Sequence, residues 1–179
     1  MRTIVVCVAI ALQAVDPDQA AFRTFNNAVA RYLALQQRIR TEVSGLTPNS
    51  TAKELTDASD RLAAAIRRAR PRAAQGEFFD AEAARVIRDR ISAELGSPAT
   101  TVAIESIDDE SRPVIRPSIH LRFPEASEMA TMPPSILRLL PPLPSELEYR
   151  IIGEYLVLRD IGAAMIIDFI PGAVPRKKR

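Results

Sequence analysis

The residues of this sequence best suited to chemistry lie in the alternating segment 115–123, whose polar positions are Arg116, Ser118, His120 and Arg122. Side chains two positions apart on a strand point to the same face of a sheet. An extended strand would therefore place two guanidinium groups beside a hydroxyl and an imidazole. Because arginine can grip a carboxylate or a phosphate with two parallel hydrogen bonds, the pattern predicts a candidate anion-binding face. The alternative is the solvated face of a half-covered sheet.

A hydrolase that uses Ser118 as nucleophile and His120 as base is a further alternative. The sequence has no Gly-x-Ser-x-Gly elbow, and it designates neither an orienting acid nor an oxyanion hole. The acidic run 108–110 lacks the spaced oxygen ligands and the glycine of an EF-hand loop. Cys7 is the only cysteine, so a zinc-thiolate cluster within one chain is excluded. We therefore predict no catalytic residue, no cofactor and no metal ligand.

Two basic clusters are candidates for binding anions. The first lies near the predicted end of the second helix and comprises Arg67, Arg68, Arg70 and Arg72. Cations at a helix C-terminus are also what the helix dipole favours, so the cluster has a structural explanation, and anion binding stays open beside it. The second is the tail 176–179, which follows a Pro- and Gly-containing stretch. Because aromatic residues do not interleave with these charges, we predict no nucleic-acid partner.

Residues 1–14 have the layout of a short secretory signal peptide. Arg2 precedes an uncharged run over residues 3–12, and the small residue Ala14 follows. The run is too short for a helix that crosses a bilayer, so we predict no stable membrane span. These features predict a periplasmic or secreted protein. The alternative is that residues 3–12 form a buried strand, in which case the protein would be cytoplasmic.

Residues 15–97 are predicted to be helical. Asp16 and Pro17 are typical of an N-cap and a first helical position. Seam residues, nearly all apolar, then recur at spacings of three and four up to Leu46, as in a long amphipathic helix that Gly45 and Pro48 end. This seam consists of Phe22, Phe25, Val29, Tyr32, Gln36, Ile39, Val43 and Leu46. Gln36 is the polar member of the seam, and such a residue usually determines how helices align.

Two further helices follow. Thr51 and Glu54 have the spacing of a capping box, and Leu55, Leu62, Ile66 and Ala69 carry the apolar stripe of a helix that Pro71 ends. The short link between the first two helices predicts an antiparallel hairpin, seam against seam. A third helix is predicted over residues 80–95.

Residues 98–175 are predicted to form an antiparallel sheet. A hairpin over 101–123 comes first, and a Pro-rich crossover over 124–146 contains a short apolar helix from Ile136 to Leu140. Three strands over 147–152, 155–160 and 165–170 then form a meander, with Gly153 in the first turn.

The turns of the meander also predict its register. Tyr149 should face Leu158, and Leu158 should face Ile167. One face of the meander is then core: Leu147, Tyr149, Ile151, Leu156, Leu158, Met165, Ile167 and Phe169. On the outer face Glu148 should lie opposite Arg159, while Arg150 and Asp168 should flank Val157 in a lattice of cross-strand charges.

The C-terminal fifth of the chain resembles a group of uncharacterised exported bacterial proteins. The resemblance is carried by three segments: Leu143-Pro144-Ser145-Glu146-Leu147-Glu148-Tyr149-Arg150, Leu156-Val157-Leu158-Arg159-Asp160 and Ile167-Asp168-Phe169-Ile170-Pro171. It implies an envelope location, but no activity, cofactor or functional residue.

The sequence as a whole predicts an α+β domain in which a helical hairpin and a third helix pack on one face of an antiparallel sheet. The expected function is that of a non-catalytic binding or structural module of the bacterial envelope. Its partner would be another protein or a second copy, bound through the helix Ile136 to Leu140 or through the helical seam. A small anionic-ligand binding protein that uses Arg116, His120 and Arg122 is the alternative.

Overall fold

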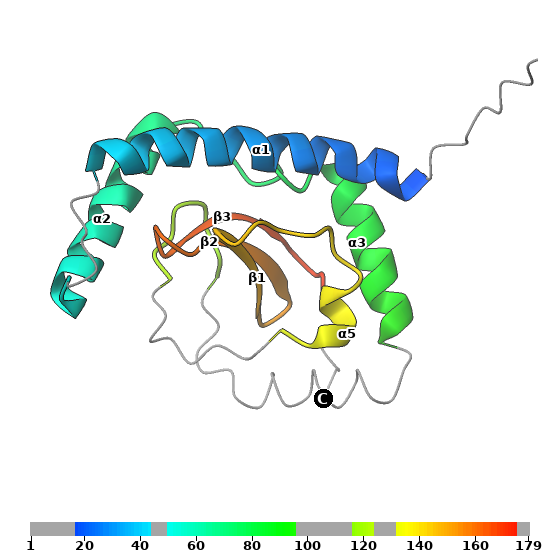
Figure 1. The fold of residues 1–179 in the computed structure, drawn as a ribbon. Helices are drawn as coiled ribbons and strands as arrows, with labels where there is room; N and C mark the ends of the chain where they lie inside the picture. The colour runs from blue at the N-terminus through cyan, green and yellow to red at the C-terminus, as the bar shows by residue number, and fades with distance from the viewer. Residues whose placement is uncertain (1–16, 44–49, 96–115, 124–131, 175–179) are drawn as a thin grey trace, which may run out of the picture.

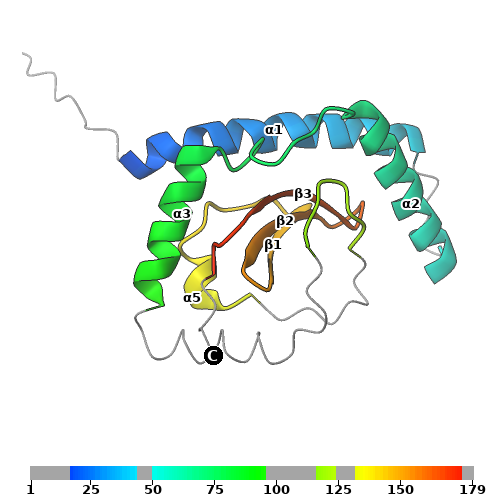
Figure 2. The same cartoon turned by 180° about the vertical axis from the view of Figure 1, so that it is seen from behind.

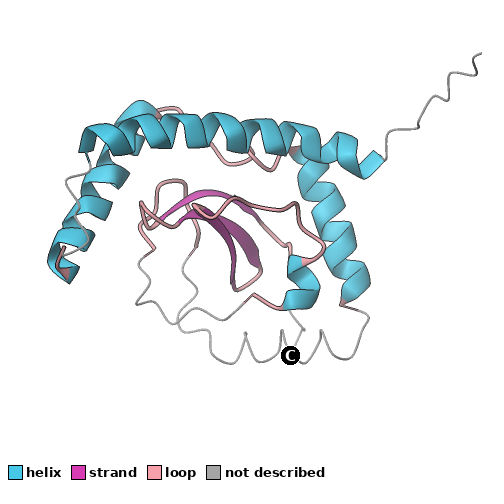
Figure 3. Ribbon diagram, in the orientation of Figure 1, coloured by secondary structure: helices cyan, strands magenta, loops and turns pink. Residues whose placement is uncertain are grey.

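The computed structural model describes residues 17–43, 50–95, 116–123 and 132–174, and shows an α+β fold (Figures 1 and 3). The helices are α1 (Pro17–Val43), α2 (Ala52–Ala69), α3 (Ala81–Glu94) and the short α5 (Pro134–Leu137). The strands β1 (Leu147–Ile152), β2 (Tyr155–Asp160) and β3 (Met165–Ile170) form an antiparallel meander. The predicted fold class is confirmed. The predicted signal peptide (residues 1–14), the acidic run 108–110 and the basic tail 176–179 lie outside the described residues.

The helices begin where local chemistry predicts. Thr51 caps α2 with its side-chain oxygen while the Glu54 carboxylate accepts the backbone N–H of Thr51, which is a complete capping box. Asp80 caps α3 by accepting the N–H of Ala83 at 2.8 Å. Pro17 is the first residue of α1. This position suits proline, because a backbone N–H there would have no partner within the helix.

The first two helices meet differently from the predicted hairpin. In Figures 1 and 2, α1 runs the length of the molecule, α2 crosses its C-terminal end at a steep angle, and α3 descends near its N-terminal end. The seam of α1 packs instead on aromatic rings from other elements. Phe25 stacks on Phe79 and on Tyr149, and Tyr32 meets Phe78 edge to face. The loop between α2 and α3 thus takes the place that we expected α2 to fill.

The seam of α1 is consequently buried within the chain itself. Its members Phe22, Phe25, Val29, Tyr32, Gln36 and Ile39 are all buried. In the described part of the crossover, Ile136 and Leu140 belong to the core, and Tyr149 donates its hydroxyl proton to the carbonyl of Pro141. Leu137 is the exception, at 49% exposed. The two predicted docking surfaces are therefore largely covered by the protein's own core.

The β1–β2 register agrees with the prediction, and the β2–β3 register does not. Tyr149 lies opposite Leu158, but Leu158 lies opposite Asp168 instead of Ile167. A bulge between Leu158 and Arg159 causes the shift, because an extra residue in one strand displaces everything beyond it. Asp168 is consequently buried, and Phe169 lies on the other face against Tyr155.

The predicted outer charge lattice is therefore only half present. Glu148 is paired with Arg159, as the β1–β2 register requires, and also with Arg150, two residues along β1. Arg159 is buried and donates a further hydrogen bond to the carbonyl of Phe123. Asp168 takes no part in this cluster.

Residues 116–123 form a turn rather than the predicted strand. The turn lies at Ile119–His120, and His120 has a φ of 66°, which interrupts an extended backbone. The segment still follows the edge of β3: the N–H groups of His120 and Phe123 donate to the carbonyls of Ile166 and Ala164. A strict alternation of side chains is lost, and in the described part of the chain the sheet has three strands.

Two buried carboxylates connect the sheet to the helical layer. Asp160 accepts hydrogen bonds from the Tyr32 hydroxyl at 2.5 Å, the Gln36 amide at 2.7 Å and the N–H of Ala163. Asp168 accepts the N–H groups of Gly76, Phe78 and Phe79 in the loop between α2 and α3. Burial raises the pKa of Asp168 although these N–H groups oppose the rise.

We expect Asp160→Ala to lower the free energy of unfolding by about 3 kcal/mol or more, because it leaves a hydroxyl, an amide and a backbone N–H without an acceptor. Asp57→Ala is the matched control. It breaks an exposed pair with Lys53, which should change stability by less than about 1 kcal/mol. Urea unfolding of both variants measures the difference, and equal losses would contradict the role of Asp160.

Candidate functional site

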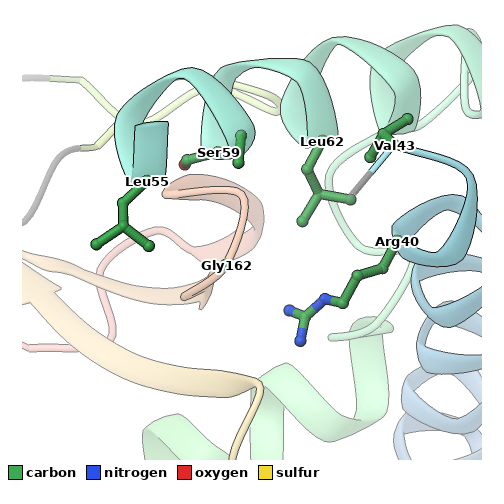
Figure 4. A pocket seen from close by; sticks show the side chains of 7 residues that line it. Arg40, Val43, Leu55, Ser59, Leu62 and Gly162 are labelled. Carbon is green, nitrogen blue, oxygen red and sulfur yellow. The ribbon is translucent and has the colours of Figure 1, made fainter. Parts of the chain in front are cut away.

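A pocket of about 350 Å³ opens between α1, α2 and the turn from β2 to β3. Figure 4 shows the side chains that line it: Arg40, Val43, Leu55, Ala58, Ser59, Leu62 and, from the turn, the backbone of Gly162. Two consecutive helices and a turn far along the chain thus contribute to one cavity. The volume is at the lower end of the range of about 300 to 1,000 Å³ that small-molecule pockets occupy.

The walls of the pocket are mostly aliphatic. Leu62 and Ala58 are buried parts of the α2 stripe, whereas Leu55, one turn earlier, is 51% exposed. Leu55 therefore belongs to the predicted apolar stripe of α2 without being buried in the core. In Figure 1 the first turns of α2 extend beyond the sheet, so Leu55 borders the pocket and does not pack into the core.

Arg40 provides the charge of the pocket. Its side chain comes from the last turn of α1 and extends toward Gly162 (Figure 4). A Cβ at position 162 would lie 2.5 Å from Nη2 of Arg40, so the missing side chain of the glycine leaves room for the guanidinium group. Arg40 forms no hydrogen bond or ion pair with any described residue.

The buried acid of this region, Asp160, forms no ion pair with Arg40. Both oxygens of Asp160 are occupied by neutral donors, with Tyr32 and Gln36 on one oxygen and the N–H of Ala163 on the other. Burial and the nearby charge of Asp160 hold the pKa of the Tyr32 phenol well above its usual value. Tyr32 therefore keeps its proton and remains a donor to Asp160.

The structure separates the four residues of the predicted anion-binding face. Arg116 and Ser118 are exposed. Arg122 turns to α2, where it forms an ion pair with Asp60 and hydrogen-bonds to Ser59 and to the carbonyl of Ala163. Arg122 therefore fastens α2 to the β2–β3 turn behind the pocket, through Ser59.

His120 lies in a different environment from Arg122. Its pKa is lowered by burial and by the positive charges of Arg70 and Arg67, while Glu77 raises it. Within the described residues no hydrogen bond joins the imidazole to Ser118, and Nε2 is buried without a partner. The pair that a hydrolase would need is not formed in this structure.

The pocket itself was not among the sequence predictions. Arg40 follows Gln36 by four positions, so the helical period does place it on the same side of α1 as the seam. The position of Gly162 beside it depends on the packing of the sheet, for which the local sequence has no signal. The exposure of Leu55, a member of the apolar stripe of α2, is likewise visible only in the structure.

Comparisons of this chain with protein-family models, curated proteins and solved structures find no match. Among the helices described here, none is long and apolar enough to cross a membrane. Over the same residues there is no group of three or more His, Cys, Asp or Glu side chains arranged to hold a metal ion. The geometry of the pocket is therefore the basis for a functional hypothesis.

The lowered pKa of His120 predicts a loss of stability in mild acid. The unfolded chain binds a proton near pH 6.5 and the folded chain only at a lower pH, so stability falls as the pH drops below 6.5. His120 is the only histidine. We expect His120→Asn, which tolerates the same backbone conformation, to be less sensitive between pH 7.5 and 5.5. Thermal unfolding at both pH values tests this, and identical sensitivity in wild type and variant would refute it.

Proposed function

We propose that this protein is a non-catalytic binding module whose pocket takes a small ligand with an aliphatic body and one carboxylate. The proposal rests on the observation that Arg40 lines an aliphatic cavity and has no acid partner among the described residues. A carboxylate would complete the hydrogen bonding of the guanidinium group in a bidentate pair. The body of the ligand would cover Leu55 and lie against Val43 and Leu62.

The placement of the charge supports one anionic group on the ligand. Among the described residues that line the pocket, only Arg40 is charged and only Ser59 has a side-chain hydroxyl. Arg122, behind Ser59, is already paired with Asp60. A ligand with two or more anionic groups would therefore leave part of its charge unmatched, which is costly in an aliphatic setting.

We place this module outside the cytoplasm, in the periplasm or in the medium. The basis is the leader-like composition of residues 1–14 and the resemblance of the last fifth of the chain to exported bacterial proteins. Catalysis is not part of the proposal, because the described residues of the pocket include neither a nucleophile paired with a base nor a pair of carboxylates.

Calorimetric titration with straight-chain carboxylates of six to fourteen carbons tests the proposal. We expect saturable binding at one or more chain lengths and none of the alcohol of equal length. Arg40→Gln should weaken the binding about tenfold or more, the loss expected for a charge-assisted hydrogen bond. Arg38→Gln is the matched control, since Arg38 lies near Arg40 on α1 and is exposed; it should bind as the wild type does.

Filling the cavity supplies an independent test. The β2–β3 turn should tolerate Gly162→Val once the end of Arg40 moves aside, because the atom that the new side chain meets first is the flexible end of Arg40. This variant should remain folded by circular dichroism and lose binding. No binding of any carboxylate by the wild type, or unchanged binding by Arg40→Gln, would overturn the proposed function.

A further inference from the structure

Ser59, on the wall of the Arg40 pocket, has a hydroxyl group that accepts a hydrogen bond and donates none to a described residue. Its Oγ accepts from Nη1 of Arg122 at 3.2 Å. A guanidinium group carries only donors, so Ser59 must be the acceptor in this bond. The positive charge of Arg122, which lies behind Ser59, directs the hydroxyl proton away from itself. The proton is thereby left for the side on which Ser59 lines the pocket.

The backbone of α2 does not take up this proton. A serine or threonine within a helix often donates its hydroxyl proton to the carbonyl four residues earlier. Thr56 does so on the same helix, because it donates to the carbonyl of Ala52 at 3.0 Å. Within the described residues, no such bond joins Ser59 to the carbonyl of Leu55. Ser59 therefore keeps one donor for a bound molecule.

The lining residues place this donor at a defined distance from Arg40. A Cβ at position 162 would lie 2.5 Å from Nη2 of Arg40 and 3.5 Å from Cδ2 of Leu62, so the guanidinium group lies beside Leu62. Ser59 precedes Leu62 by three residues, which is about 4.5 Å along the helix axis. Leu55 lies one turn further on, on the side of the pocket away from Arg40 (Figure 4).

An acid held by Arg40 would pass Ser59 with the carbons that follow its carboxylate. Three carbon–carbon bonds of about 1.5 Å each cover the distance from Leu62 to Ser59. An oxygen atom on the third carbon of the chain would therefore come beside the Ser59 hydroxyl. A hydroxyl group at this carbon can also donate its own proton to the carboxylate of the same molecule. Neither hydroxyl is then left without a partner in an aliphatic setting, where an unpaired polar group is costly.

We propose that the ligand of this pocket is a 3-hydroxylated carboxylic acid whose hydroxyl oxygen accepts the proton of Ser59. The inference rests on the proposed function, since it takes Arg40 to hold the carboxylate. Arg40 then sets the requirement for an acid, and Ser59 selects among acids by the position of one oxygen atom. The remaining carbons lie against the aliphatic wall toward Leu55.

Two isomers of one acid test the position of this oxygen atom. The probes are the 3-hydroxy and the terminally hydroxylated forms of the straight-chain acid that the wild type binds best, such as 3-hydroxydecanoate and 10-hydroxydecanoate. The two have the same charge and composition. We expect calorimetric titration to show about fivefold or more tighter binding of the 3-hydroxy isomer, as for one neutral hydrogen bond.

The outcomes separate this inference from the proposed function. Equal affinity for the two isomers, or a preference for the terminal one, would overturn the inference and leave the proposed function intact. No binding of any carboxylate would overturn both. The comparison uses the wild type, so it does not depend on the folding of a variant.

Substitution of Ser59 locates the selection in the protein. Ser59→Ala removes the donor, so the preference for the 3-hydroxy isomer should disappear. Thr56→Val is the matched control, because Thr56 is exposed on the same helix and its hydroxyl is bound to Ala52; it should keep the preference. If a folded Ser59→Ala still prefers the 3-hydroxy isomer to the same extent, the selection has another source and the inference is wrong.

Discussion

Two carboxylates buried in the sheet, Asp160 and Asp168, govern how the helices are placed. Neither is exposed to solvent, and the hydrogen-bond donors identified for each are neutral. Moving a carboxylate out of water is costly unless several donors converge on it. The helical layer must therefore bring Tyr32 and Gln36 to one acid and the N–H groups of the α2–α3 loop to the other.

The position of the candidate pocket follows from the first of these carboxylates. Gln36 binds Asp160 and lies one helical turn before Arg40, while Gly162 follows Asp160 by two residues in the turn. When Gln36 is held at Asp160, Arg40 is necessarily held near Gly162. The same hydrogen bonds that anchor α1 thus set a guanidinium group at the mouth of an aliphatic cavity.

Features encoded by neighbouring residues could be predicted from the sequence. The caps of α2 and α3 depend on side chains three positions apart, and the β1–β2 register follows from the tight turn at Gly153, whose φ is 57°. In each case the partner groups are close in the chain, so the pattern specifies the structure.

Features that depend on distant partners could not be predicted. The bulge in the β2–β3 pair turns Asp168 inward, where its acceptors are satisfied by N–H groups that come about ninety residues earlier. Segment 115–123 alternates like a strand, yet Arg122 leaves that pattern to pair with Asp60 of α2. Within the predicted anion-binding face, Arg122 is therefore structural. His120 lies close enough to Arg70, from the basic cluster at the end of α2, for that charge to lower its pKa.

Asp160 also explains why two arginines near one buried acid both keep unused donors. Arg40 and Arg70 each lower the pKa of Tyr32, the residue that binds Asp160, so both charges act on the same phenol. If Asp160 had formed an ion pair with either arginine, its oxygens would have accepted hydrogen bonds from that guanidinium group, and the same N–H donors could not bind another group. Because Tyr32, Gln36 and Ala163 occupy its oxygens instead, Asp160 stabilises the neighbouring charges only at a distance. Arg40 therefore has no acid partner among the described residues, and its guanidinium group lines the pocket.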